Sequence, residues 1–437
     1  MVFILITVNV LVLFLLWGSL SALKRRRLLE DLPTSKTVGV FIGLVELKGT
    51  AESEAPLLGL LSEQPCVWYS WNVLEHWSKI VTETSHDKDG KLQTRTRTES
   101  GWTTIASGGE SKPFYLQDDL GVIRINPEHA EIKSKTVFNR NCSMSDPLYY
   151  GKGPTNTIAH STGKRSFTEQ AILLHQTVYV VGQSRERLDC VAAEIAYDRS
   201  SPIFLISTLT EEKHRSYGLV MFWLLGLLAV FLPVVVGFIA QFNQVDFPDF
   251  FVLALGTGGC ALLIWGIGWF WLIYNSLIGL KNRVKSAAAN IDVELKRRHD
   301  LIPQLIGTVE GLQRHEHDLQ ETLVVLRSQI DVQSVAGGNT ANGCMNRIVA
   351  IVENYPDIRA NELFMKLQSY LVEAEQRIAL ARTYYNDMVE THNNRRERFP
   401  ECLIAVLAGL RVVPRFEAEN FERSAVKVNL VQQVSNQ

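Results

Sequence analysis

An uncharged hydrophobic run passes without a turn signal into a helical pattern at residues 274–305, which read YNSLIGLKNRVKSAAANIDVELKRRHDLIPQL. Apolar side chains recur every seven residues here and beyond, and a second apolar row follows four residues behind the first. This pattern is typical of a helix that packs against other helices. The sequence therefore predicts a long amphipathic helix that continues straight out of a membrane. Its first row is Leu277, Val284, Ile291, Leu305, Leu312, Leu319 and Leu326, and its second row is Ala288, Leu295, Ile302, Val309, Leu323 and Ile330.

Arg298 occupies a first-row position where a leucine would fit. One interpretation is that its side chain reaches past the edge of a bundle into water. The other is a buried charge that fixes the register of the helices. Its partner would then be Glu294, one turn back, or a carboxylate from a later helix. The sequence leaves both interpretations open.

A second helical pattern runs from Phe364 to His392 and ends before Phe399-Pro400. We expect it to pack on the first helix within a bundle over residues 274–416, with Cys402–Val413 packing back on it and residues 417–437 forming a flexible tail. A break near Val335–Asn339 and a shorter helix over Met345–Glu353 separate the two patterns. The residues expected to form the helix seam and the contacts of a homo-oligomer are Leu277, Val284, Ile291, Leu295, Arg298, Ile302, Leu371, Ile378 and Tyr385.

These helical patterns resemble the LemA family of membrane-anchored helical proteins. The matching blocks are Tyr-Asn at 274–275, Leu-Lys-Asn-Arg-Val at 280–284, Ile-Asp-Val-x-Leu-Lys-Arg-Arg at 291–298 and Asp-Leu-Ile-Pro at 300–303, followed by a second set from Glu375 to Pro400. Two ordered blocks over roughly the last third of the chain make the resemblance specific. It implies a coiled-coil-like helical domain attached to a membrane.

Three hydrophobic segments are long enough to span a bilayer, at residues 1–22, 217–240 and 250–273. A cleaved signal peptide is the alternative for the first, but its positive charge follows the apolar run rather than preceding it. Positive charge stays in the cytoplasm, so we expect the N-terminus outside and both polar regions inside. A bacterial inner membrane is favoured. The charged flanks are Lys24, Arg25, Arg26 and Arg27, then Lys213, His214 and Arg215, then Lys281, Arg283 and Lys285.

The polar segment over residues 35–207 has mostly strand-like patterns. Apolar residues alternate over Val38–Leu44 and Val67–Val73, and a hairpin turn is predicted at Asp118–Gly121. Thr177–Gly182 and Val191–Tyr197 are predicted to form another hairpin pair. Ser166-x-x-Glu169 is typical of a capping box and predicts a short helix that reaches about His175.

This segment resembles the GIDE, or beside-a-membrane, domain. The matching features are Gly39-x-x-x-Gly43, Cys66-Val67-x-Tyr69, the Phe114 to Ile123 hairpin and Val180-Val181-Gly182. In mitochondrial proteins with this domain, a RING finger follows the last span and ligates ubiquitin. A RING needs about eight Cys or His ligands. Cys344 and Cys402 are the only cysteines after the third span and are not a close pair, so the resemblance does not extend to ligase activity.

Several polar residues invite a chemical interpretation. His315-Glu316-His317 has the wrong spacing for two metal ligands on one helix face. Asp118 and Asp119 form either a carboxylate pair or, as we favour, part of a turn. Cys66 with His76 is either a nucleophile pair or, as we favour, inert strand packing. Lys24, Arg25, Arg26 and Arg27 fit a basic cluster at a lipid surface as well as a topology signal.

The chain as a whole predicts an α+β membrane protein of 437 residues, with a β-rich GIDE-like domain between transmembrane helices and an all-α long-helix bundle after them. The formal net charge of -2 argues against a nucleic-acid partner. We expect no cofactor, no metal and no catalysis. The expected function is a self-associating membrane scaffold, whose partners are further copies, lipid and an unidentified protein at the GIDE-like domain. One alternative is a ubiquitin-ligase-like transferase or its accessory, disfavoured because RING zinc ligands are lacking. The other is a transporter, opposed by spans without ionisable residues.

Overall fold

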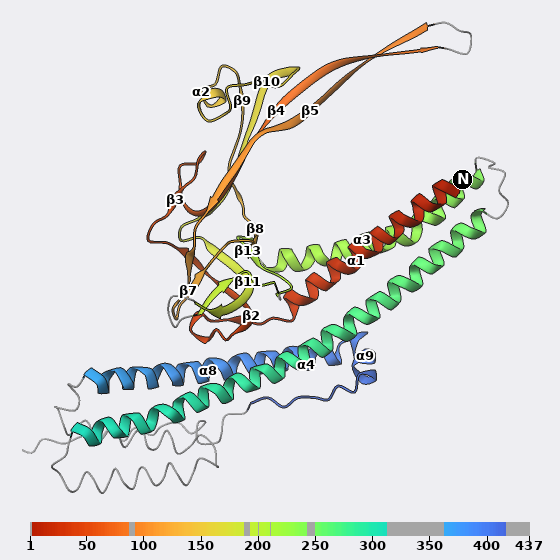
Figure 1. The fold of residues 1–437 in the computed structure, drawn as a ribbon. Coiled ribbons are helices and arrows are strands. Elements are labelled where there is room, and N and C mark those ends of the chain that lie inside the picture. Colours follow the sequence, from red (N-terminus) through yellow and green to blue (C-terminus); the bar gives the residue numbers. More distant parts are fainter. Residues whose placement is uncertain are drawn as a thin grey trace, which may run out of the picture. The chain divides into compact units, whose positions relative to one another are not determined.

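The computed structural model describes residues 2–86, 92–187, 193–199, 201–209, 211–242, 250–312 and 362–416. It divides into two compact units, Met1–Leu262 and Leu263–Gln437, which are described separately below. Figure 1 shows the elements of both.

Three helices in the described part of the chain are long and apolar enough to cross a membrane. They are α1 (Val2–Glu30), α3 (Glu211–Phe242) and α4 (Phe250–Leu312). Helices α1 and α3 lie side by side and run antiparallel (Figure 1). Between them, the Ser19 hydroxyl donates a buried hydrogen bond of 2.7 Å to the Phe222 carbonyl oxygen. The two helices thus enter and leave the polar segment at the same end.

The first turns of α4 pack on α3 through small residues. A Cβ added at Gly258 would lie 3.1 Å from the carbonyl oxygen of Val230, so the two backbones approach closely there. Ala254 and Ala261 are buried, whereas an added Cβ at Gly256 or Gly259 would meet no atom within 4 Å. The face of α4 that packs on α3 therefore consists of residues 254, 258 and 261, and Gly256 and Gly259 lie outside it.

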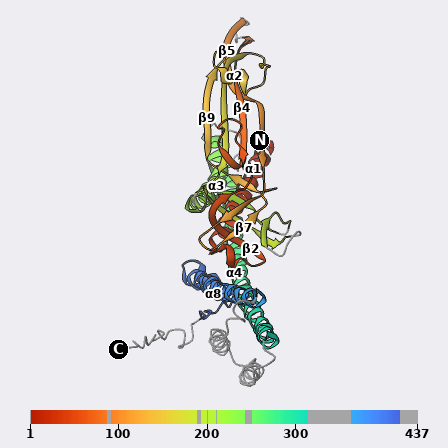
Figure 2. The same ribbon diagram turned by 90° about the vertical axis from the view of Figure 1, so that its left-hand side faces the viewer.

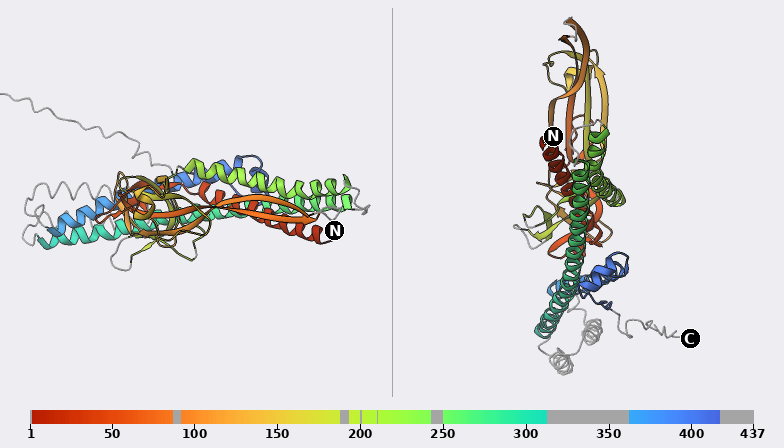
Figure 3. Two further views of the ribbon diagram at one scale, coloured as in Figure 1. Left: turned by 90° about the horizontal axis from the view of Figure 1, so that it is seen from above. Right: turned by 90° about the vertical axis from the view of Figure 1, so that its right-hand side faces the viewer.

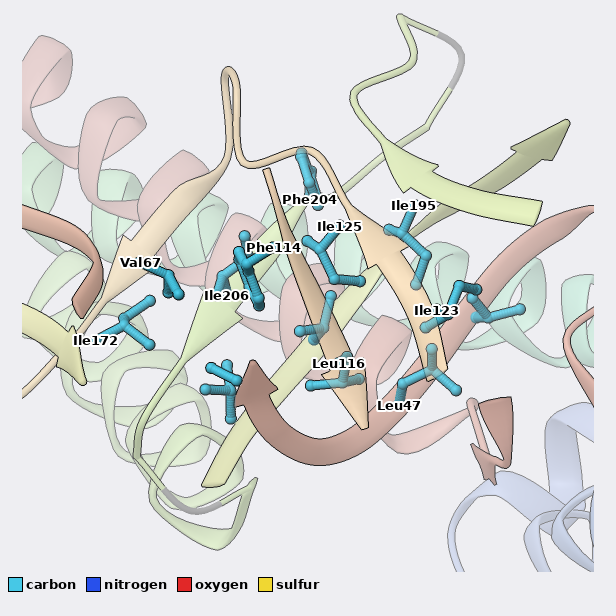
Figure 4. Close-up of a cluster of buried hydrophobic side chains, with 14 of the residues drawn as sticks. Leu47, Val67, Phe114, Leu116, Ile123, Ile125, Ile172, Ile195, Phe204 and Ile206 are labelled. Carbon is cyan, nitrogen blue, oxygen red and sulfur yellow. The ribbon is translucent and has the colours of Figure 1, made fainter. Parts of the chain in front are cut away.

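A closed β-barrel forms the base of the polar segment. Its strands are, in order around the barrel, β2 (Gly43–Glu52), β6 (Phe114–Gln117), β7 (Val122–Ile125), β12 (Ala193–Ala196) and β11 (Thr177–Glu186), which pairs back to β2. Closure removes the exposed sheet edges of these strands. Figure 4 shows the buried interior, which includes Leu47, Phe114, Leu116, Ile125, Ile195 and Ile206.

Short strands extend this sheet beyond the barrel. β13 (Leu205–Ser207) pairs with β11, β8 (Glu131–Lys133) pairs with β13, and β1 (Thr34–Ser35) pairs with β2. Because β13 directly precedes α3, the last strand leads from the sheet into a candidate span.

A second sheet contains the longest strands in the described part of the chain (Figure 2). It comprises β5 (Leu92–Ser111), β4 (Pro65–His86), β10 (Ser161–Leu173) and β9 (Thr136–Ser143), with β3 (Leu57–Leu58) at the start of β4. The pairing of β10 with β4 reaches only Trp77, whereas β5 pairs with β4 as far as His86. The ends of β4 and β5 therefore continue as a two-stranded arm (Figure 1).

Two local predictions are wrong in this region. Val38–Leu44 does not form a strand throughout: a 3-10 turn, η1 (Thr37–Gly39), comes first and β2 begins at Gly43. Ser166 and Glu169 lie within strand β10, because residues 165, 167, 169 and 171 alternate into the interior. The helix of this region is instead α2 (Pro147–Gly151), capped by the Asp146 side chain. The predicted β6–β7 hairpin is present. Strands β11 and β12 also pair, but through residues 183–186 and 193–196, whereas the predicted segment Thr177–Gly182 pairs with β2 and, in part, with β13.

The second unit is built from the later part of α4, α8 (Glu362–Glu397) and the short helix α9 (Glu401–Leu407). Helices α4 and α8 lie side by side (Figure 3). Helix α4 continues past Pro303 to Leu312 without a break. The predictions for Leu319, Leu323, Leu326, Ile330, His315–His317, Val335–Asn339, Met345–Glu353 and residues 417–437 lie outside the described residues.

Candidate functional site

The helical seam between α4 and α8 is the candidate site of the second unit. Leu277, Val284 and Ile291 of the first predicted row are buried. On α8, Leu371 and Ile378 are buried, and Tyr385 is half-buried. One apolar cluster joins Leu280, Val284 and Ala287 to Met388 and Val389, with Tyr384, Tyr385 and Val413 packed against it. The structure thus brings the two predicted patterns together along this part of α4.

The second buried row of α4 differs from the expected one. It follows three residues behind the first and consists of Leu280, Ala287 and Glu294, whereas Ala288 and Leu295 are only half-buried. The side chain of Ile302 lies outside the described part. The expected row did not include Glu294, which is charged. Its carboxylate is buried nevertheless, because α8 supplies a cation to it.

Two ion pairs join α4 to α8 beside the apolar rows of the seam. Arg298, 6% exposed, donates to the Glu375 carboxylate of α8 at 2.9 Å. Arg377 of α8 donates to Glu294 at 3.4 Å in the opposite direction. Of the two interpretations of Arg298, the structure therefore has the buried charge with a carboxylate from the later helix. Two reciprocal pairs between the same helices oppose a slip in register, because a slip would leave buried charges unpaired.

Another buried ion pair lies near the start of the seam and was missed by the sequence analysis. Arg395 donates to the Glu401 carboxylate at 2.8 Å and to the Ser276 hydroxyl at 2.8 Å. It therefore ties α8, α9 and α4 together. A signal was available, because Arg395 continues the helical spacing of the buried residues Met388 and His392.

A different face of α8 carries residues spaced by seven, at positions 365, 372, 379, 386 and 393. Asn393 exchanges hydrogen bonds with the backbone of Val413, at 2.9 and 3.1 Å. Asn386 does the same with Phe416, at 3.1 and 2.8 Å. The extended segment 410–416 therefore covers the C-terminal half of this face. The other half displays Met365, Val372 and Ala379, which we call the outer stripe of α8.

The basic cluster at the end of α1 is largely engaged in ion pairs. Arg26 and Arg27 pair with Glu30 at 2.6 and 3.4 Å, and Arg25 pairs with Glu131 of β8. Lys24 is exposed. The cluster thus helps to join α1 to the β-rich sheet, which is a structural role beside the expected one at a lipid surface.

A fully buried arginine organises the second sheet. The Arg165 guanidinium donates to the Glu75 carboxylate from Nε at 3.3 Å and Nη2 at 3.1 Å, and to the carbonyl oxygens of Tyr149, Pro154 and Asn156 at 2.7, 2.7 and 2.8 Å. All five of its N–H groups are thereby used. Burial raises the pKa of Glu75, but hydrogen bonds from Ser161, Tyr149 and Arg165 outweigh it and leave the pKa below the usual value. The pair is a structural clamp on α2 and the following loop.

The other sequence candidates in this unit are also structural. Asp118 accepts hydrogen bonds from Thr37, Leu120 and Gly121, as expected of a turn residue. Asp119 pairs instead with Lys36. Burial raises the pKa of the Cys66 thiol to about 11, which disfavours the nucleophilic thiolate. His76 lies ten residues along the same strand, roughly 33 Å away.

Within the described ranges, no group of three or more His, Cys, Asp or Glu side chains is arranged to hold a metal ion. The arrangements that the structure does present are packing surfaces and ion pairs that fix one element against another.

Two family models match the chain. The LemA family model matches residues 287–430, and the GIDE model, described as E3 Ubiquitin ligase, matches residues 82–230. Magnetosome protein MamQ of Magnetospirillum gryphiswaldense is 31% identical over 33% of this chain. Magnetosome protein MamQ 2 of Paramagnetospirillum magneticum is 22% identical over the same share, and protein LemA of Metamycoplasma hominis is 24% identical over 36% of this chain and 76% of its own length. The chain spans 64% of the length of the MamQ relatives.

Proposed function

From the premise that this chain joins a GIDE region to a LemA-family region, we propose that it is a non-enzymatic membrane scaffold. Copies associate through the helical unit at the cytoplasmic face of the membrane. The observation that carries the proposal is that α8 has two apolar faces. One is buried on α4, and the other is the outer stripe, with Met365 50% and Val372 52% exposed.

Packing between copies is the simplest use of the outer stripe. Fully burying a methionine or valine side chain contributes about 1.5–3 kcal/mol. That is modest for two free proteins, but membrane anchors restrict the copies to one surface and one orientation. Weak contacts then act at a high effective concentration, so several of them together hold an assembly. Closed symmetry is the usual outcome for contacts between identical chains.

The orientation in this proposal rests on the three positively charged flanks of the candidate spans. In intact bacterial cells, a membrane-impermeant thiol reagent should label Asn243→Cys, between the second and third spans. It should spare Leu120→Cys and Val372→Cys, which lie at exposed positions of the β-rich and helical units. The parent protein gives the background from its own cysteines. Labelling at Leu120→Cys without labelling at Asn243→Cys would reverse the orientation.

Light scattering on the full-length protein purified in detergent tests the self-association. We expect a mass of several copies, which persists when residues 35–207 are deleted. Met365→Glu with Val372→Glu should reduce the mass toward that of a monomer. The matched control is Ile80→Glu with Leu120→Glu, which adds the same charge at exposed apolar positions of the β-rich unit. A monodisperse full-length monomer at micromolar concentration would overturn the proposal.

The GIDE match favours one second candidate, an accessory role in ubiquitin transfer. In this role the β-rich unit would recruit a protein partner while another protein supplies the catalytic zinc domain. Ubiquitin transfer that requires the β-rich unit in a reconstituted reaction would support this candidate over the scaffold.

A further inference from the structure

Helix α9 and its flanks present an unusually apolar surface. Phe399, Leu403, Val406 and Leu407 are 76%, 60%, 75% and 75% exposed. Residues 402–410 contain no charged side chain, and the preceding Glu401 is buried against Arg395. In water, such a group of large apolar side chains on a short helix marks a contact with another phase or another molecule.

The opposite side of α9 fixes its position along α4. Ile404, Ala405 and Leu410 are buried against Ile273 and Leu277, with Trp269 packed against the same cluster. The helix is therefore held beside the part of α4 where the uncharged hydrophobic run ends.

The length and composition of α4 put the expected edge of a bilayer at this level. Residues 250–280 contain no Asp, Glu, Lys or Arg. They make roughly 46 Å of helix, whereas the hydrocarbon core is about 30 Å thick. A span that begins near residue 252 would thus leave the hydrocarbon near Ile273. Trp269, Trp271 and Tyr274 mark the same level, since Trp and Tyr gather at membrane interfaces.

We propose that α9 lies in the lipid interface, with Phe399, Leu403, Val406 and Leu407 directed into the acyl-chain boundary. Helices that lie in the plane of a membrane interface bury an apolar face in the lipid and keep their charged side chains at the headgroups. Arg398 and Arg411 are exposed at the two ends of the apolar segment, where anionic headgroups would receive them.

This contact would be a fourth attachment to the membrane, made by a segment that does not cross it. Through the Arg395–Glu401 pair and the Ser276 hydrogen bond, α9 is coupled to both α4 and α8. Its attachment would therefore set the tilt of the helical hairpin where it leaves the bilayer. The inference does not depend on self-association, because it uses only the packing and charge of one copy.

A lipid-quenching experiment on the full chain tests the proposal. Leu403→Cys and Val406→Cys carry an environment-sensitive fluorophore, in protein with the native cysteines replaced and reconstituted in nanodiscs. Val372→Cys on α8 is the control, because its side chain is also exposed and apolar. With phospholipids brominated on the acyl chains, we expect strong quenching at positions 403 and 406 and little at 372.

Two results would overturn the assignment. Water-like emission at positions 403 and 406, with no quenching by brominated lipid, would place this face in solvent. The other contrary result is an apolar emission that brominated lipid does not quench. If that emission also shifts when excess lipid is used so that each nanodisc holds a single copy, a second copy rather than lipid covers the face.

Discussion

The two units bury arginine in different ways. Arg165 in the β-rich unit is fully buried, and so is its partner Glu75. Arg298 in the helical unit is also buried, with 7% of its side chain exposed, but the side chain of its partner Glu375 is 43% exposed. The first pair is enclosed by strands and a loop of one sheet, whereas the second lies at the rim of a two-helix seam. An ion pair at the rim is partly screened by water, so the hairpin depends more on its apolar rows than on its charges.

The largest loss of stability is expected from Arg165→Met. It leaves the Glu75 carboxylate buried without its cation and frees three carbonyl oxygens, for a loss of about 3–5 kcal/mol. Hydrogen exchange on the full-length protein should speed up in β4, β10 and α2, with α8 unchanged. Lys164→Met, at the neighbouring exposed position, is the control. Equal exchange in both variants would contradict the clamp.

A somewhat smaller loss is expected from Leu371→Asp in the helical unit. Leu371 is 3% exposed on the seam, so the substitution buries a carboxylate without a partner and costs about 3 kcal/mol. Exchange should speed up in α8 and in α4 beyond residue 280. Ser369→Asp is the control, since this exposed position of α8 belongs to neither the seam nor the outer stripe. If both substitutions had the same effect, the assignment of the seam face would be wrong.

Removing the rim charge should have a weaker effect. Glu375→Gln keeps the size of the side chain and should cost about 1 kcal/mol, because water screens the exposed carboxylate. The cost should shrink at high salt, unlike that of Arg165→Met. Glu390→Gln, which removes an exposed pair with Arg415, provides the reference for a surface ion pair. A loss as large as that of Arg165→Met would contradict the distinction between the two pairs.

The smallest effect should come from pH. Burial lowers the pKa of His392, and the nearby Arg396, Lys281 and Arg395 lower it further, against the Asn393 hydrogen bond. Its folded pKa therefore lies below the unfolded value, and the unfolded chain takes up more protons as the pH falls through the ordinary histidine range. The helical unit should lose stability over that range as acid is added. His392→Leu should remove this part of the dependence, measured as exchange in α8 at matched pH steps. If acid destabilised the His392→Leu variant more than the parent protein, the predicted direction of the His392 contribution would be wrong.

The sequence predicted the helical unit well because its pattern has a single period. The spacing of Leu277, Val284 and Ile291 fixes one helix face, and Leu371 and Ile378 fix the other. It misjudged the second row because Glu294 is charged, and its partner Arg377 is 83 residues away. Pairing over such distances carries no local signal.

The β-rich unit was predictable only in outline. Alternating apolar residues predicted β4, β6 and β7. Near Ser166 and Glu169, by contrast, no local pattern indicates that the backbone N–H groups of Leu61 and Ser62 donate to the Glu169 carboxylate. The polar alternation in β10 therefore resembled a capping box. Closure of the barrel through β2 and β11 is likewise a pairing between distant residues, which only the three-dimensional fold reveals.

The central claim is that the helical unit, rather than the β-rich unit, joins copies of the chain. Spin labels at Val372→Cys on α8 and at Ile80→Cys on the arm, both exposed positions, compare the two units in full-length protein in lipid. Dilution with unlabelled protein identifies coupling between copies. The account predicts a short, well-defined distance between copies at position 372 and a longer or broader one at position 80. Coupling at position 80 with none at position 372 would contradict it.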